Sequence, residues 1–254
     1  MTTLIISDLH LGARNSRADL IADLLRTDFD RLVLNGDTVD HPDPRRLRAP
    51  DWRVVALLKA VARERELVVV RGNHDALPGP GNARGATHFV AELLRTPVVE
   101  EYVLEVGGGR YLVVHGDQFD GTMNLTWVGD VADWVYQGMQ RLSRPLAHFA
   151  KQASKHVCGV VESVERGAVA HARRRGFAGI ITGHTHFWHD ERRDGLHSLN
   201  TGCWVDAPCS YVLAEDDAVR LVHWTERGAR AVPRPARMSA CSRDGNRSPA
   251  SIPV

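Results

Sequence analysis

Cysteine, long apolar stretches and net charge are all scarce in this 254-residue chain. Its four cysteines, Cys158, Cys203, Cys209 and Cys241, lie far apart and form no Cys-x-x-Cys pair. This spacing argues against a thiolate-bound metal and against a disulfide framework. No apolar stretch approaches the ~20 residues that a membrane-spanning helix needs. The chain begins directly on a strand-like run without a basic leader or cleavage site, so we expect a cytoplasmic protein without a secretory signal.

The charge balance is nearly neutral, with a formal net charge of +1. No global field therefore draws the molecule onto nucleic acid or membrane. A hydrophobic content of 43% and a length of 254 residues suit one globular domain with a substantial core. From Glu226 to Val254 the chain contains six arginines and two acidic residues, in a Pro-, Ser- and Gly-rich segment without hydrophobic periodicity. We therefore predict one domain over residues 1–225, followed by a disordered basic tail over 226–254.

Short apolar runs alternate with amphipathic stretches in the first part of the chain. Thr3–Ser7, Arg31–Asn35 and Leu67–Arg71 have the pattern of strands, and helices are predicted around residues 20–25 and 52–61. This β-α-β-α-β order predicts an α/β fold with strands buried on both faces and covered by helices. Ligands of such sheets bind beyond the carboxyl ends of the strands.

The rest of the chain predicts a loop, a short helix and several further strands. The Pro/Gly-rich loop spans residues 78–85, and the glycines at 107–109 connect the two strands of a hairpin. The predicted helix is Phe89–Arg95, and the predicted strands are Glu100–Val106, Arg110–His115, Gly179–Gly183, His197–Asn200, Ser210–Ala214 and Val219–Trp224.

Strand patterns stop between Thr122 and Arg175, where apolar residues recur at helical spacing. One stripe runs from Trp127 to Leu142 and a second from Ala153 to Ala168. We predict a helical insert over about residues 122–175. Its two helices either pack on the sheet and on each other, or form a cap whose apolar side grips a lipid-like substrate or a second copy in a homodimer.

Polar motifs stand at the ends of the apolar runs. They are Asp8-Leu9-His10, Gly36-Asp37, Gly72-Asn73-His74-Asp75, His115-Gly116-Asp117 and Gly183-His184-Thr185-His186. Carboxylate oxygens with imidazole nitrogens suit Mn, Fe, Zn, Co or Ni better than an all-oxygen calcium site. Two such cations ~3.5–4 Å apart clamp both the attacking and the leaving oxygen of a phosphoryl centre. Each motif alone is common, so it is their joint occurrence after successive strands that predicts a two-metal hydrolase.

This order of motifs resembles the calcineurin-like metallophosphoesterase superfamily, over roughly residues 1–224. The resemblance implies a four-layer α-β-β-α sandwich of two mixed sheets flanked by helices, with the helical region as an insert. It implies two divalent metal ions, with Mn foremost and Fe, Zn, Co or Ni as alternatives. The implied ligands are Asp8, His10 and His186 for the first metal, Asp37 as the bridge, and Asn73, His115 and His184 for the second.

The resemblance also implies catalytic roles for the two residues that follow Asn73. His74 contacts the phosphate and protonates the leaving oxygen, while Asp75 orients the His74 imidazole through a carboxylate–histidine hydrogen bond. The expected activity is hydrolysis of a phosphodiester or diphosphate bond.

The motif His115-Gly116-Asp117-Gln118-Phe119-Asp120 and the helical insert are similar to the bacterial UDP-2,3-diacylglucosamine diphosphatase-like subgroup. That subgroup implies a nucleotide-linked or lipid-linked diphosphate substrate and a peripheral position at the inner membrane. Two positions depart from the pathway enzymes: His74 stands where they carry Arg, and Cys203 where relatives often show Asp.

Candidate substrate contacts are few. Arg45, Arg46 and Arg48 follow the Gly-Asp motif in a Pro-rich loop and either bind a second phosphate or form a solvated basic loop. Asp120 is a candidate substrate contact or a partner of a metal ligand, and Lys155 on the insert faces either the cleft or water.

Two other functions stay open. A phosphodiesterase or nuclease acting on nucleic acid or cyclic nucleotides would use the same metals, but the body has no basic stripe with interleaved aromatics, so nucleic acid is disfavoured. A binding scaffold that kept the fold without turnover is disfavoured because no predicted ligand is missing.

Overall fold

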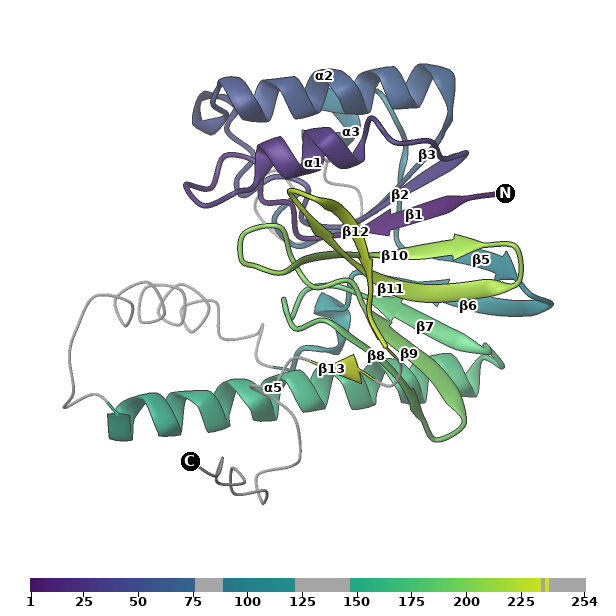
Figure 1. The fold of residues 1–254 in the computed structure, drawn as a ribbon. Helices are drawn as coiled ribbons and strands as arrows, with labels where there is room; N and C mark the ends of the chain where they lie inside the picture. The colour runs from purple at the N-terminus through teal and green to yellow at the C-terminus, as the bar shows by residue number, and fades with distance from the viewer. Residues whose placement is uncertain (76–88, 122–146, 234–235, 238–254) are drawn as a thin grey trace, which may run out of the picture.

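Two β-sheets packed face to face form the centre of the molecule in the computed structural model (Figure 1). The structure describes residues 1–75, 89–121, 147–233 and 236–237, with only the backbone for 147–158 and 236–237. In these residues the first sheet has the order β12-β11-β10-β1-β2-β3-β4 and the second β13-β8-β9-β7-β6-β5. The strands of the first sheet are β1 (Thr3–Ile6), β2 (Arg31–Asn35), β3 (Glu66–Val70), β4 (Val98–Val99), β10 (Cys209–Glu215), β11 (Ala218–Thr225) and β12 (Gly228–Ala231). Those of the second are β5 (Tyr102–Val106), β6 (Gly109–Val113), β7 (Gly179–Thr182), β8 (His189–Arg193), β9 (Leu196–Asn200) and β13 (Ala236–Arg237).

Successive residues of the central strands enter different hydrophobic cores because strand side chains alternate between the two faces. In β1, Ile5 lies in the core between the sheets, whereas its neighbours Leu4 and Ile6 lie in the core under the N-terminal helices. In β7, Ile181 joins the core between the sheets and Ile180 the core under α5 (Ala147–Arg174). Strands buried on both faces therefore read as continuous apolar runs, as predicted.

Helices cover the outer face of each sheet, which completes the predicted four-layer α-β-β-α sandwich (Figure 1). The first sheet carries α1 (Ala18–Leu24), α2 (Ala49–Glu64) and α3 (Phe89–Leu94), and the second sheet carries α5. Short 3-10 turns, η1 (Pro44–Arg46) and η2 (Asp117–Phe119), follow β2 and β6. No helix among the described residues is long and apolar enough to cross a membrane.

The long helix α5 contains the second predicted stripe, and its C-terminal half packs on the second sheet. Ala168 and Ala172 belong to the core under α5, and Val164 is buried. The first predicted stripe, residues 127–142, lies outside the described residues, as does the Pro/Gly-rich loop at 78–85.

Parallel pairing brings the motif-bearing strand ends to one edge of each sheet. In the first sheet β1, β2 and β3 are parallel, so the segments that follow Ile6, Asn35 and Val70 emerge side by side. In the second sheet β6 and β7 are parallel, and Gly183 N donates to the carbonyl of His115 (2.8 Å). Both sheets therefore deliver their polar motifs to a common edge, as expected from the sequence.

Regular structure extends beyond the predicted domain end at residue 225. β12 pairs with β11 in register Thr225↔Gly228, and β13 pairs with β8. The prediction of a disordered tail from residue 226 is wrong for these segments, because unpaired edge strands supply backbone partners that an aperiodic sequence does not reveal. Residues 238–254 lie outside the described part of the chain.

Candidate metal centre

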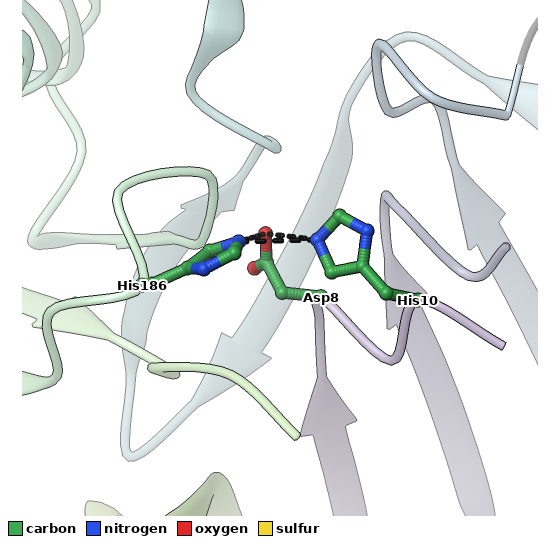
Figure 2. A group of neighbouring side chains, drawn as sticks. All are labelled: Asp8, His10 and His186. Atoms are coloured by element: carbon green, nitrogen blue, oxygen red, sulfur yellow. Dashed lines mark hydrogen bonds and ion pairs between the residues drawn. The ribbon is translucent and has the colours of Figure 1, made fainter. Parts of the chain in front are cut away.

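Asp8, His10 and His186 converge at the edge between the sheets (Figure 2). His186 Nε2 lies 3.2 Å and His10 Nε2 3.8 Å from the same oxygen, Asp8 Oδ1. The two ring nitrogens themselves are 3.1 Å apart. Figure 2 shows the two rings pointing at the Asp8 carboxylate from opposite sides. One carboxylate oxygen and two imidazole nitrogens therefore face a single point.

A second group lies next to the first and contains Asp37, His115 and Asn73. His115 Nε2 is 3.2 Å from Asp37 Oδ2 and 3.2 Å from Asn73 Oδ1. Asp37 Oδ2 also lies 3.9 Å from His10 Nε2, so Asp37 stands between the two groups. This is the position that a bridging ligand requires.

The donor set fits two divalent cations. His115 Nδ1 donates to the backbone carbonyl of Asn35 (2.8 Å), which leaves the Nε2 lone pair for a metal. Asp8 Oδ1 and His10 Nδ1 are buried and have no hydrogen-bond partner. Oxygen and nitrogen lone pairs gathered so closely repel one another unless a proton or a cation lies between them, and buried polar atoms ordinarily have a partner.

The backbone at most of these residues is strained. Asp8, His10, Asp37, His184 and His186 all have positive φ, between 42° and 66°. Residues with a Cβ rarely occupy this left-handed region, and such strain concentrates at functional sites. The fold thus holds five of the seven predicted ligands in conformations that each cost free energy.

Two motif glycines let the first-sheet loops approach one another. Gly36 has φ 84°, and a Cβ there would overlap the His115 ring. A Cβ on Gly72 would overlap the backbone and carboxylate of Asp37. Glycine at both positions therefore allows Asp37 and His115 to come within reach of one metal.

His184 lies beside the centre, with its ring centroid 5.3 Å from that of His115. Its Nε2 lies 3.1 Å from Asp120 Oδ2, and its backbone N–H donates to Asp8 Oδ2 (3.1 Å). Because Asp120 takes Nε2, Nδ1 is the atom left for a cation. Asp120 is thus placed as the partner of a predicted ligand, one of the two roles expected for it.

Asp75 does not form the hydrogen bond to the His74 imidazole that the sequence led us to expect. Its Oδ1 accepts hydrogen bonds from the backbone N–H groups of Thr38 (2.8 Å) and Val39 (3.2 Å), and it is 1% exposed. His74 Nδ1 donates instead to the backbone carbonyl of Asp40 (2.9 Å). His74 and Asp75 thus have different partners, because two backbone N–H groups of the loop after Asp37 take the Asp75 carboxylate, which supports that loop.

Asp40 is the site residue that the sequence analysis missed. Its Oδ1 lies 3.9 Å from His10 Nδ1, and its carboxylate groups with His10 and His74. The signal was present, since Asp40 is the second carboxylate of Gly36-Asp37-Thr38-Val39-Asp40.

The buried charges perturb one another. Burial lowers the pKa of His115, but the charge and hydrogen bond of Asp37, together with the charges of Asp8 and Asp117, outweigh burial and raise that pKa to about 10. Burial raises the pKa of Asp37, but His115 holds it well below its ordinary value. Burial, followed by the charge of Asp37, raises the pKa of Asp75 to about 7. For His10, burial dominates and lowers the pKa to about 4.

Two predicted substrate contacts are not part of this cluster as described. Arg45 is 88% exposed and pairs with Asp43 at 2.8 Å on the surface. Lys155 lies on the first half of α5, where the structure describes only the backbone.

Comparison with known proteins gives a family match and several structural neighbours. Residues 1–187 match the model of the calcineurin-like phosphoesterase family. YfcE, a phosphoesterase from E. coli, is 18% identical with a TM-score of 0.51, covering 91% of this chain and 97% of YfcE. A single mutant of Vps29 from Entamoeba histolytica is 17% identical with a TM-score of 0.50, covering 93% of this chain and 98% of Vps29. No curated protein matches the sequence.

At identities this low, the likeness to these structures shows a shared fold and nothing more about this chain. The family match is broader, since it spans more than half of the chain and includes every predicted metal ligand. The chain therefore belongs to the calcineurin-like phosphoesterase family and is a metal-dependent hydrolase with candidate ligands for the metal in place.

Proposed function

We propose that this protein uses two divalent cations, Mn²⁺ first among them, to hydrolyse a diphosphate or phosphodiester bond in a nucleotide-linked or lipid-linked substrate. The observation that supports this most is the position of Asp37 between the group around Asp8 and the group around His115. Asp8, His10 and His186 would hold one cation, and Asn73, His115 and His184 the other. When bound, the pair of cations supplies an activated water and neutralises charge on the phosphoryl oxygens.

The chain's own residues supply orientation and a proton. His74 donates Nδ1–H to the Asp40 carbonyl, which fixes the ring and leaves Nε2 for the substrate. Burial lowers the pKa of His74, but the charge of Asp37, together with the Asp40 carbonyl and the charges of Asp40 and Asp75, outweighs burial and keeps the pKa above its ordinary value. A protonated His74 Nε2 is suited to bind a phosphoryl oxygen and to give its proton to the leaving oxygen.

Asp75 acts through the backbone. Its carboxylate binds the N–H groups of Thr38 and Val39 and thereby fixes the loop that carries Asp37 and Asp40. The role proposed for Asp75 is thus to position both the bridging carboxylate and the carbonyl that holds His74.

For the substrate, the candidate class is a UDP-linked, acylated sugar such as UDP-2,3-diacylglucosamine. The motif around Asp117 and Asp120 supports it, and a generic diphosphate suits the same centre. The structural neighbour YfcE is a phosphoesterase, which agrees with the reaction class proposed here.

The test is a substrate panel with Mn²⁺-loaded protein: aryl phosphate mono- and diesters, UDP-sugars, UDP-diacylglucosamine, cyclic nucleotides and single-stranded DNA. We expect Mn²⁺-dependent hydrolysis of the aryl diester and of at least one diphosphate. Activity on monoesters alone would sink the diphosphate assignment, preference for DNA or cyclic nucleotides would favour the phosphodiesterase alternative, and no turnover of any substrate would favour a scaffold.

A further inference from the structure

Three arginines follow the Gly36-Asp37 motif, and two of them serve the loop itself. Arg45 binds both carboxylate oxygens of Asp43 on the surface. Arg48 donates to the carbonyls of Ala13 (2.7 Å) and Arg14 (3.2 Å) and thereby ties the start of α2 to the loop after β1. Neither guanidinium is directed at the metal centre by these contacts.

Arg46 differs because its partner belongs to the site. Its Nη2 lies 2.6 Å from Asp40 Oδ2. The other oxygen of that carboxylate lies 3.9 Å from His10 Nδ1, and the Asp40 backbone carbonyl accepts the hydrogen bond from His74. A single carboxylate therefore separates the Arg46 guanidinium from a predicted metal ligand and from the predicted proton donor.

The backbone of Arg46 is held in place, whereas its side chain is accessible to solvent. Its backbone N–H donates to the Asp43 carbonyl (3.0 Å), and a Cβ on Gly12 would lie 3.3 Å from its carbonyl oxygen. The side chain is 47% exposed. A guanidinium has five N–H donors, so one held by Asp40 leaves others free to bind an anion from solvent.

A diphosphate substrate needs such a group. In the proposed reaction two cations and His74 would serve the phosphate that is cleaved, and the charge of the adjacent phosphate would need a further partner. The planar fork of an arginine matches phosphate oxygens better than any other side chain. Asp40 would hold this fork at the His10–His74 side of the centre, which lowers the entropy lost when the substrate binds.

We propose, resting on the proposed function, that Arg46 is the specificity residue that binds the non-scissile phosphate of a diphosphate substrate. It distinguishes diphosphates from single-phosphate esters, and Arg45, its neighbour on η1, does not take part.

The experiment measures affinity rather than turnover. Calorimetry measures the binding of two ligands to the Mn²⁺-loaded wild type, Arg46→Ala, Arg46→Lys and the matched control Arg45→Ala. The ligands are UMP and α,β-methylene-UDP, a diphosphate analogue whose two phosphorus groups are joined by a methylene that is not cleaved. We expect Arg46→Ala to raise the Kd for the diphosphate analogue about tenfold or more, since a charge-assisted hydrogen bond is lost, and to change the Kd for UMP less than about twofold. Arg46→Lys should lie between, and Arg45→Ala should match wild type.

Three results would overturn the assignment. In the first, the wild-type protein binds the diphosphate analogue no more tightly than UMP. In the second, Arg46→Ala loses equal affinity for both ligands. In the third, Arg45→Ala weakens binding of the diphosphate analogue as much as Arg46→Ala does. A parallel assay of bis(p-nitrophenyl) phosphate hydrolysis distinguishes failure of the Arg46 assignment from failure of the proposed function. Loss of diester turnover in Arg46→Ala with unchanged Kd values would make Arg46 only a support for Asp40. Absence of Mn²⁺-dependent diester turnover in wild type would instead refute the proposed function.

Discussion

At the residue scale, the centre combines polar ligands with a backbone forced into unusual conformations. Asp8, His10 and Asp37 carry positive φ because the strand ends turn sharply to present their side chains. These residue types were predicted from the sequence, since Asp and His after apolar runs have few other reasons to recur. The hydrogen bonds of the site were not predicted from the sequence, because the partners of carboxylates such as Asp40 and Asp75 depend on the conformation of the loops that carry them.

Asp37 and His74 should separate metal binding from turnover. Asp37→Ala removes the carboxylate between the two groups, so we expect loss of bound Mn²⁺ together with activity. His74→Ala removes the proposed proton donor and keeps every proposed ligand, so we expect full metal content with turnover reduced by ~10²-fold or more. Elemental analysis and diester hydrolysis measure the two effects; full metal content in Asp37→Ala would show that Asp37 is not a bridge.

Metal binding should release protons at neutral pH. In the metal-free protein the pKa of His115 is about 10, so its imidazole is protonated at pH 8. A metal binds only the neutral imidazole, so binding at pH 8 displaces this proton, and the release from His115 falls as the pH rises through about 10. Calorimetry of Mn²⁺ binding at pH 8 in buffers of different ionisation enthalpy measures the number of protons released. His115→Gln should lower this number by about one. A binding enthalpy that is the same in every buffer would contradict protonation of His115 in the metal-free protein.

At the element scale, the strands with apolar patterns were predictable and those held by buried polar groups were not. β7 and β10 follow the predicted runs closely. β8 was missed because its sequence, His-Asp-Glu-Arg-Arg, has no apolar pattern. It is a strand because its buried charges have partners: Asp190 accepts from His197 Nε2 (2.9 Å) and from the backbone N–H of Leu221 (3.0 Å), which joins the two sheets. Such satisfaction depends on tertiary contacts that the local sequence does not encode.

Glu165 should anchor α5 to β8. This carboxylate is 2% exposed and lies 2.7 Å from Arg193 Nη2 and 3.1 Å from His189 Nδ1. Truncating it removes the partner of the buried His189 Nδ1 and one of the two carboxylates that pair with Arg193, whose other partner is Glu191. Glu165→Ala should therefore lower the free energy of unfolding by about 2 kcal/mol.

The control for this prediction is Ser163→Ala, on the exposed face of the same helix, which should change stability by less than about 0.5 kcal/mol. Urea denaturation measures both variants. Equal stability of Glu165→Ala and Ser163→Ala would mean that the ion pairs contribute nothing to the attachment of α5.

At the scale of the whole molecule, the sandwich matters because it joins ligands from two sheets. Asp8, Asp37 and Asn73 follow strands of the first sheet, whereas His115, His184 and His186 follow strands of the second. The order of motifs predicted a two-metal hydrolase, and the family resemblance that the motifs carry implied the arrangement of two sheets. The role proposed for Arg46 in substrate choice rests on its contact with Asp40, which its position in the sequence does not reveal.

The central claim is that the two sheets hold a pair of metal ions with Asp37 between them. The most direct test is a crystal structure grown with Mn²⁺, with anomalous diffraction recorded at the Mn edge. We predict two anomalous peaks ~3.5–4 Å apart, one beside Asp8, His10 and His186 and the other beside Asn73, His115 and His184, with Asp37 contacting both. A single peak, or two peaks without Asp37 between them, would contradict it.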